Sequence, residues 1–180
     1  MNGQLYSIGH SNRSLEAFIA LMLGQAIKTL IDVRAYPQSR HNPQFSMDEL
    51  RTALEQADII YHWAGRQLGG MRKAVDGSPH TALQNESLRA YADHMSTEEF
   101  RRGVNQLAQL AEKAPTVIMC AEKLPEHCHR ALLADYLVLQ GIDVIHIIDD
   151  AEIRHHLLSP FARRESEQLI YDRHTTASLL

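Results

Sequence analysis

The sequence lacks the features that define several large classes of protein. It has only two cysteines, Cys120 and Cys128, in 180 residues, so no disulfide framework is expected and a reducing, cytoplasmic location is predicted. No apolar run approaches the ~18 residues that a membrane span needs, and no membrane contact is predicted. The start of the chain has neither a basic nor a long apolar segment, so no signal peptide is expected.

Common binding motifs are also missing. Neither GxGxxG nor GxxxxGK[ST] occurs, so the usual dinucleotide and P-loop phosphate cradles have no support, and no cofactor is predicted. The CxxC and HxxxH spacings typical of zinc sites are absent, and no metal ligands are assigned. The net charge of −4 argues against wholesale wrapping of nucleic acid, although it permits a local basic patch. Nothing in the sequence predicts an oligomeric state.

Short apolar runs alternate with helical patterns along the chain. Runs typical of strands lie at 5–8, 29–33, 59–62, 117–119 and 144–148. Helical patterns follow the capping residues Ser14, Ser46 and Ser96, and another opens at Cys128. This alternation predicts an α/β fold: a single three-layer α/β/α domain, Rossmann-like, with a mostly parallel sheet of about five strands.

The organisation of the remaining segments follows from the same patterns. We expect the α/β domain to occupy 1–150 and a short helical appendage with a tail to occupy 151–180, with helices at 153–158 and 161–171. The glycine-containing stretch 63–83 has no period and is interpreted as a long loop, either a functional lid or a disordered segment.

Polar residues follow the predicted strands at the edge of the sheet where ligands bind in such folds. A parallel sheet brings these residues together although they are far apart in the sequence, and the pattern therefore predicts one composite site. The clusters are His10, Ser11, Asn12 and Arg13 after the first strand; Arg34, Tyr36, Ser39, Arg40 and His41 after the second; His62, Trp63 and Arg66 after the third; and Cys120 and Glu122 after the fourth.

Three arginines at this edge, Arg34, Arg40 and Arg130, favour an anionic ligand. A guanidinium group presents paired donors to phosphate or carboxylate, and three such groups would repel one another without an anion. The alternative for Arg34 is a structural ion pair with Asp32 of its own strand. The predicted substrate-binding residues are Ser11, Asn12, Arg13, Arg34, Arg40 and Arg130.

The two cysteines allow several interpretations. Cys128 lies between two histidines and beside Arg130, neighbours that favour a thiolate, so it is a candidate nucleophile or redox sensor with His127, His129 or His10 as base. Cys120 alone is typical of a buried small apolar residue. A disulfide between them requires the loop to fold back and is not expected as a permanent feature. A zinc site is the third interpretation, with ligands from Cys120, Cys128, His129 and His10.

The sequence resembles the family catalogued as Domain of Unknown Function 488. The matching stretches are SIGHSNR at 7–13, IDVR at 31–34, Pro37, Ser39-Arg40, NPQF at 42–45, MCAE at 119–122 and HCHR at 127–130. They occur in the family's order and cover most of the chain up to about residue 148. The resemblance implies an α/β fold and a site built from these motifs. It implies no particular activity, although members are sometimes labelled DNA-repair proteins.

We therefore expect an enzyme that binds a phosphate-bearing substrate, either a nucleotide or a nucleic acid. His10 is predicted to act as acid or base, Cys128 or Cys120 as a nucleophile or site-lining thiol, and Glu122 as an orienting group. The expected partner is an anionic small molecule or nucleic acid. A non-catalytic nucleic-acid-binding module and a zinc-dependent sensor or hydrolase are the alternatives. The full set of predicted catalytic residues is His10, Cys120, Glu122, Cys128 and His129.

Overall fold

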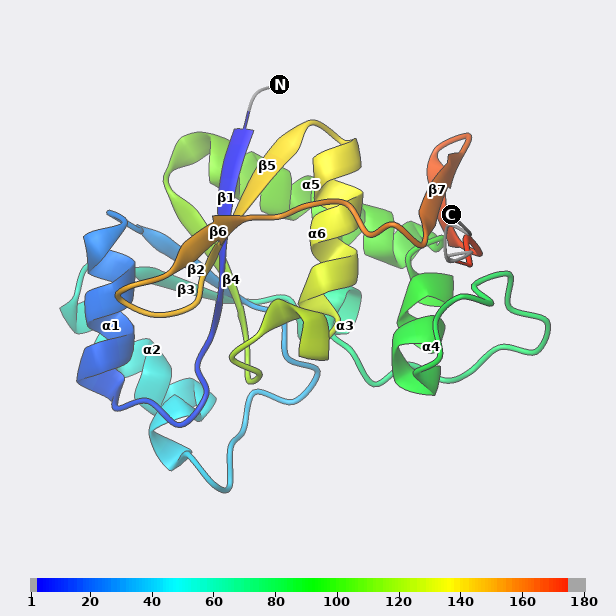
Figure 1. Cartoon of the computed structure of the whole chain (residues 1–180). Helices are drawn as coiled ribbons and strands as arrows, with labels where there is room; N and C mark the ends of the chain where they lie inside the picture. Colours follow the sequence, from blue (N-terminus) through cyan, green and yellow to red (C-terminus); the bar gives the residue numbers. More distant parts are fainter. Residues whose placement is uncertain (1–2, 175–180) are drawn as a thin grey trace.

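A six-stranded sheet forms the centre of the computed structural model, which describes residues 3–174 (Figure 1). The strand order is β3-β2-β4-β1-β5-β6. The first five strands in the sequence are parallel, and β6 joins β5 in the antiparallel direction. The predicted Rossmann-like α/β fold is confirmed. The strands are β1 (Gly3–Gly9), β2 (Thr29–Asp32), β3 (Ile60–Trp63), β4 (Thr116–Cys120), β5 (Ile142–Ile147) and β6 (Ile153–His155).

Helices cover both faces of the sheet. One face packs against α1 (Leu15–Gly24) and α2 (Met47–Gln56), and the other against α5 (Glu98–Lys113) and α6 (Arg130–Leu139). The shorter helices are α3 (Gly65–Leu68), α4 (Glu86–His94) and the 3₁₀ turns η1 (Pro43–Phe45) and η2 (Pro125–His127). Within the described residues, none of the helices is long and apolar enough to cross a bilayer.

The two hydrophobic cores follow from the alternation of side chains along the strands. Leu5 and Ile8 of β1 are an odd number of positions apart and point to opposite faces. Both β2 and β4 are buried along their whole length, which explains the adjacent apolar residues at 30–31 in β2 and 117–119 in β4. One core contains Ile8, Phe18, Met22, Leu30, Leu50 and Leu54, and the other contains Leu5, Ile31, Phe100, Leu107, Leu133 and Leu137.

The helix boundaries agree with the sequence patterns to within a few residues. The Ser14 hydroxyl accepts the Ala17 N–H at 3.1 Å, as the capping pattern predicts. The cap of α5 is Thr97 and not Ser96. The Ser46 hydroxyl makes no capping bond in α2 and instead accepts the Ser39 N–H at 3.3 Å. The helix expected from Cys128 begins at Arg130, because η2 occupies the preceding turn.

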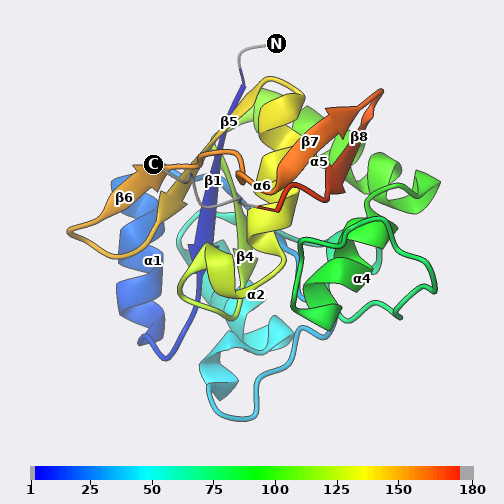
Figure 2. The same cartoon turned by 45° about the vertical axis from the view of Figure 1, so that its right-hand side comes forward.

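The end of the chain differs from the prediction. Helices expected at 153–158 and 161–171 are absent from the described residues, and strands β6, β7 (Ala162–Glu165) and β8 (Gln168–Tyr171) occupy these segments. The hairpin of β7 and β8 lies outside the main sheet (Figure 2), where β8 contacts α4 and its Tyr171 hydroxyl donates to Asp135 of α6. Its two-residue loop begins at Ser166 with φ 55°, a conformation that its sequence, without glycine or asparagine, does not signal. Part of the stretch 63–83 is also regular, because it contains α3. The domain boundary at residue 150 stays a prediction.

The order of the strands creates a switch point between β1 and β4. From β1 the chain passes through α1 to β2, on one side of this pair. From β4 it passes through α6 to β5, on the other side and over the opposite face. Ligands in open parallel sheets bind at such a point, outside the carboxyl ends of the strands. The ends of these two strands are Gly9 and Cys120, which are paired in register.

Gly9 has no room for a side chain at this switch point. A Cβ atom built on Gly9 would overlap the carbonyl group of Glu122 and the backbone of Lys123. The loop after β4 therefore crosses directly over the end of β1, and this close approach requires glycine.

We expect Gly9→Ala to push this loop outward and to lower the free energy of unfolding by about 1–3 kcal/mol, the usual cost of overpacking. Gly24→Ala is the matched control, because a Cβ there meets nothing within 4 Å. Thermal and urea unfolding of both variants measure the difference. Equal free energies of unfolding for the two variants would show that the loop can move to accommodate a methyl group at no cost.

Candidate functional site

Loops that follow three strands meet at the carboxyl edge of the sheet. The backbone N–H of His10, after β1, donates to the Cys120 carbonyl at 2.9 Å. The N–H of Val33, after β2, donates to the Met119 carbonyl at 2.9 Å. Side chains also meet, since Nη1 of Arg34 lies 3.4 Å from Nε2 of His10. The structure thus brings His10, Arg34 and Cys120 together, as the strand pattern predicts.

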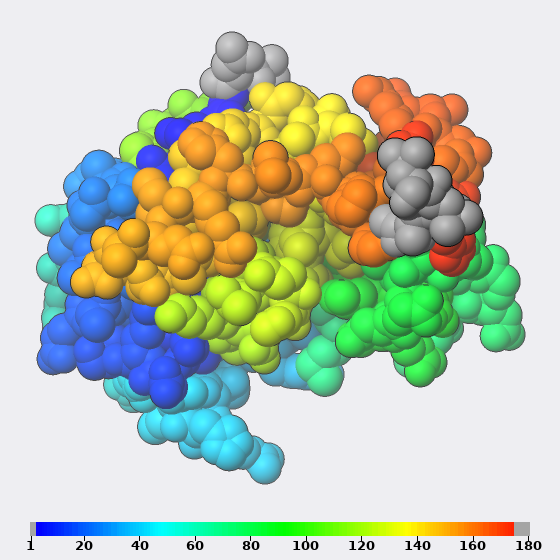
Figure 3. All heavy atoms as spheres, viewed as in Figure 1, coloured from blue at the N-terminus to red at the C-terminus, as the bar shows by residue number. Residues whose placement is uncertain are grey.

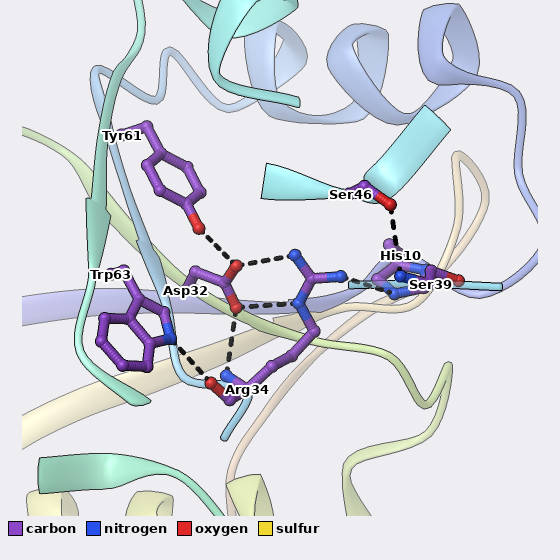
Figure 4. Close-up of polar contacts among 7 residues, drawn as sticks. All are labelled: His10, Asp32, Arg34, Ser39, Ser46, Tyr61 and Trp63. Atoms are coloured by element: carbon purple, nitrogen blue, oxygen red, sulfur yellow. Dashed lines mark hydrogen bonds and ion pairs between the residues drawn. The ribbon is translucent and has the colours of Figure 1, made fainter. Parts of the chain in front are cut away.

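Arg34 is held by a buried carboxylate from its own strand (Figure 4). Its Nε and Nη2 donate to the two oxygens of Asp32 at 2.9 and 2.7 Å. Asp32 also accepts the Arg34 N–H and the hydroxyl of Tyr61, at 3.0 and 2.6 Å. The indole of Trp63 donates to the Arg34 carbonyl at 2.9 Å. The ion pair considered for Arg34 is therefore present, and only Nη1 is directed elsewhere, towards His10.

His10 is a buried, neutral imidazole. Its ring stacks on Phe45 with centroids 4.5 Å apart, and Nδ1 donates to the Ser11 carbonyl at 2.8 Å. Because Nδ1 carries the proton, Nε2 presents a lone pair to Arg34. Burial lowers the pKa of His10 to about 4, and the charge of Arg34 acts in the same direction. His10 therefore stays neutral at physiological pH and acts as an acceptor.

The two cysteine sulfurs are in contact. Sγ of Cys120 lies 3.0 Å from Sγ of Cys128, and Nε of Arg130 lies 3.0 and 3.3 Å from these two atoms. Hydrogen bonding from Cys120, together with the charge of Arg130, lowers the pKa of Cys128 to about 6. Burial raises the pKa of Cys120 well above its usual range. The pair is thus one thiolate, on Cys128, and one thiol that donates to it.

Arg130 is completely buried and directs every arm of its guanidinium group into the protein. Besides the two sulfurs, Nη1 donates to the Ser7 hydroxyl at 2.8 Å. Nη2 donates to the carbonyls of Glu122 and Lys123, the same loop that crosses over Gly9. An external anion would have to displace these partners to reach Arg130.

The other predicted site residues lie around this centre. Nε2 of His129 donates to the Val33 carbonyl at 3.0 Å, and burial lowers the pKa of His129 to about 4. Arg13 donates to the carbonyls of Gly9 and Ile148. The remaining predicted site residues are Ser11, which is partly exposed, and Asn12, Arg40 and Glu122, whose side chains are exposed.

No three histidine, cysteine, aspartate or glutamate side chains are grouped as metal ligands within residues 3–174. The zinc interpretation therefore has no ligand set there.

Sequence reasoning missed several buried polar residues. Ser7 is a polar residue within a buried strand. Its position in that strand is the sequence signal that its hydroxyl has a hydrogen-bond partner in the core. His146 is buried on β5 opposite Ser7, and a single histidine in an apolar strand gives no spacing signal. Asp135 and Tyr171 are hydrogen-bonded to each other across 36 residues, and no local spacing reveals that pair.

Together the fold and the site define a Rossmann-like α/β protein with a dithiol at the switch point of its sheet. The chain belongs to the family described as Domain of unknown function DUF488, whose model matches residues 14–137. This match includes both cysteines and Arg130. Neither the curated proteins nor the solved structures contain a match to this chain.

We expect Arg130→Lys to raise the pKa of Cys128 by about 1, equivalent to about 1.4 kcal/mol of thiolate stabilisation. Lysine keeps the positive charge but cannot place one N–H between the two sulfurs and others on the loop carbonyls. The measurement is the rate of alkylation of Cys128 by iodoacetamide against pH, followed by peptide mass spectrometry. In the natural protein the rate should rise with pH through a midpoint at about pH 6 and reach a plateau at higher pH.

Arg89→Lys is the control for this substitution, because Arg89 is a partly buried arginine on α4 that binds a backbone carbonyl. An unchanged midpoint in Arg130→Lys would contradict the role given to the guanidinium group.

Proposed function

We propose that the protein is a dithiol enzyme that exchanges electrons with a disulfide substrate through Cys128 and Cys120. The observation that carries this proposal is the contact between the two sulfurs, with one guanidinium N–H directed at both. Redox-active cysteine pairs are found in such electropositive, partly exposed surroundings, whereas structural cysteines lie in apolar ones.

The two thiols differ in exposure and in pKa, as a nucleophile and a resolving thiol should. Cys128 is partly exposed and has the lower pKa, so it supplies the attacking thiolate. A pKa close to the ambient pH gives both a high thiolate fraction and good nucleophilicity. Cys120 is only 3% exposed and remains protonated, so it serves as the resolving thiol. No separate base is required to activate Cys128.

The exchange proceeds in two displacements. The Cys128 thiolate attacks one sulfur of the substrate disulfide, the substrate S–S bond breaks, and the first substrate thiolate leaves and takes a proton from water. Cys120 then attacks Sγ of Cys128, the mixed disulfide bond breaks, and the second substrate sulfur takes the Cys120 proton and leaves as a thiol. The products are a Cys120–Cys128 disulfide and two substrate thiols, so two electrons have passed to the substrate.

Arg130 and the histidines have distinct roles in this proposal. Arg130 touches both reacting sulfurs and stabilises whichever of them is negative. His129 is a positioning residue, because its bond to the Val33 carbonyl fixes the start of α6 against the end of β2. His10 helps to fix Arg34, to which it presents a lone pair. Glu122 contributes its backbone carbonyl to Arg130.

A phosphate-bearing substrate, nucleotide or nucleic acid, is the second candidate, and Arg40 supports it. Arg40 is exposed, whereas the donors of Arg34 and Arg130 contact protein groups. If the ligand is a nucleic acid, whether or not the protein is catalytic, we expect an affinity that falls steeply with salt and persists in Cys128→Ser. Binding to single- and double-stranded oligonucleotides at two salt concentrations tests it separately from the thiol chemistry.

We expect the two serine variants to react differently with glutathione disulfide near neutral pH. Cys120→Ser should accumulate a mixed disulfide at Cys128, because no thiol resolves it. The rate of reaction of Cys128→Ser should be lower by roughly tenfold or more, since Cys120 is buried and protonated. The natural protein should lose both free thiols and form an intramolecular disulfide. Mass spectrometry of the intact proteins measures all three.

The same reactions in denaturant provide the control, because unfolding should make the two cysteines equally reactive. Equal reactivity of the two variants in the folded state would contradict the assignment of nucleophile and resolving thiol. A mixed disulfide that persists in the natural protein would contradict the pairing itself.

A further inference from the structure

The dithiol is also suited to an oxidant much smaller than a disulfide. Sγ of Cys128 contacts Sγ of Cys120 at 3.0 Å and Nε of Arg130 at 3.3 Å, so a substrate must approach it from its remaining side. The segment around η2, which leads to Cys128, lies at the surface (yellow-green in Figure 3), and Cys128 itself is partly exposed. A hydroperoxide needs little room there, whereas a disulfide also brings the groups attached to its sulfurs.

The surroundings of Cys128 are those in which thiols react with peroxides. Cysteines of this kind have thiolate character, are accessible to solvent and lie next to a second cysteine that resolves the oxidised form. The N–H of Arg130 that is directed at Sγ of Cys128 favours the thiolate, and the contact with Cys120 provides the second thiol. Cys120 is only 3% exposed, so an oxidant from solvent meets Cys128 first.

We propose that the protein reduces hydrogen peroxide, with Cys128 as the sulfur that is oxidised first and Cys120 as the thiol that resolves it. The observation that carries this proposal is the contact of the two sulfurs, one buried and one partly exposed, beneath a shared guanidinium N–H. The peroxide reaction is a further activity. It shares the roles of the two thiols with the proposed disulfide exchange, but not the substrate.

The reduction proceeds in two steps. The Cys128 thiolate attacks one oxygen of the peroxide, the O–O bond breaks, and the other oxygen leaves as hydroxide, so that Cys128 becomes a sulfenic acid. This hydroxide takes the Cys120 proton through water. The Cys120 thiolate then attacks Sγ of Cys128, the S–O bond breaks, and a second hydroxide leaves. One peroxide has accepted two electrons and become one water and one hydroxide, and the two thiols have become a disulfide.

The contact between the sulfurs also determines the fate of the sulfenic acid. A sulfenic acid that meets no thiol is oxidised further, to a sulfinic acid that thiols do not reduce. Here Cys120 already touches the oxidised sulfur, so the disulfide forms before a second peroxide reacts. A dithiol reductant such as dithiothreitol then restores both cysteines by thiol–disulfide exchange.

The rate of reaction with hydrogen peroxide at about pH 6 tests the proposal. Half of Cys128 is a thiolate there, because its pKa is lowered to about 6. An ordinary cysteine, with a pKa of ~8.5, is a thiolate in about one molecule in 300. The weaker nucleophilicity of a low-pKa thiolate offsets roughly tenfold of this advantage. We therefore expect the folded protein to lose its free thiols roughly tenfold faster than the protein unfolded in urea.

Serine variants separate the roles of the two thiols, with mass spectrometry of the intact proteins as the measurement. Cys120→Ser should accumulate a sulfenic acid that dimedone traps, and then a sulfinic acid. The rate of reaction of Cys128→Ser should be lower by roughly tenfold or more, because Cys120 is buried and protonated. In the natural protein one equivalent of peroxide should give the intramolecular disulfide. Ala111→Ser, at a partly buried position beside the start of β4, is the control and should react like the natural protein.

Equal rates for the folded and the unfolded natural protein would overturn the proposal, as would a sulfenic acid that dimedone traps in the folded natural protein. Both outcomes decide the question even if a serine variant does not fold. The reaction with glutathione disulfide is measured on the same samples. An intramolecular disulfide that forms from glutathione disulfide but not from peroxide would overturn this proposal alone, and the reverse result would overturn only the disulfide exchange.

Discussion

The structure depends on one buried guanidinium group at the switch point of the sheet. Arg130 reaches the sulfur of Cys120 on β4 and that of Cys128 between η2 and α6. It also reaches the hydroxyl of Ser7 on β1 and the carbonyls of the loop that crosses β1. A buried charge is costly unless it is paired and fully hydrogen-bonded. The thiolate of Cys128 supplies the pairing and the loop carbonyls supply the remaining acceptors. The same contacts that allow Arg130 to be buried therefore set the reactivity of the cysteines.

The positive charges at this edge are balanced from within the protein. The sequence shows three arginines and suggests an external anion to separate them. In the structure Arg34 faces the carboxylate of Asp32, and Arg130 faces the thiolate of Cys128. Only Arg40 of the three is exposed. Two internal anions thus offset the charges of Arg34 and Arg130. For this reason the proposed chemistry is centred on the thiols and not on the arginines.

Much of the fold was predictable because its signals are local. The apolar run at 117–119 marks the buried strand β4, and the alternation of strands and helices predicts a parallel sheet. It does not predict the order of the strands, on which the position of the switch point depends. The contact between Cys120 and Cys128 was only one of several alternatives, since it depends on the path of the intervening loop. The hairpin of β7 and β8 was mistaken for helix because its turn contains Ser166 in place of glycine or asparagine. The hydrogen bonds that link His146, His156 and Asp135 join β5, the segment after β6 and α6, and the spacing of these residues does not signal them.

The outermost strands of the sheet are short, which limits the pairing of one molecule with another through the edges of their sheets. An open sheet offers unpaired backbone groups along both margins, and long flat margins invite pairing with other chains. Here the margins are β3, with four residues, and β6, with three. Ladders so short provide few intermolecular hydrogen bonds, although β3 carries the exposed side chains of Ile60 and Trp63. The central sheet is therefore wide, but its edges offer few backbone groups that could pair with another molecule and extend the sheet into a fibril.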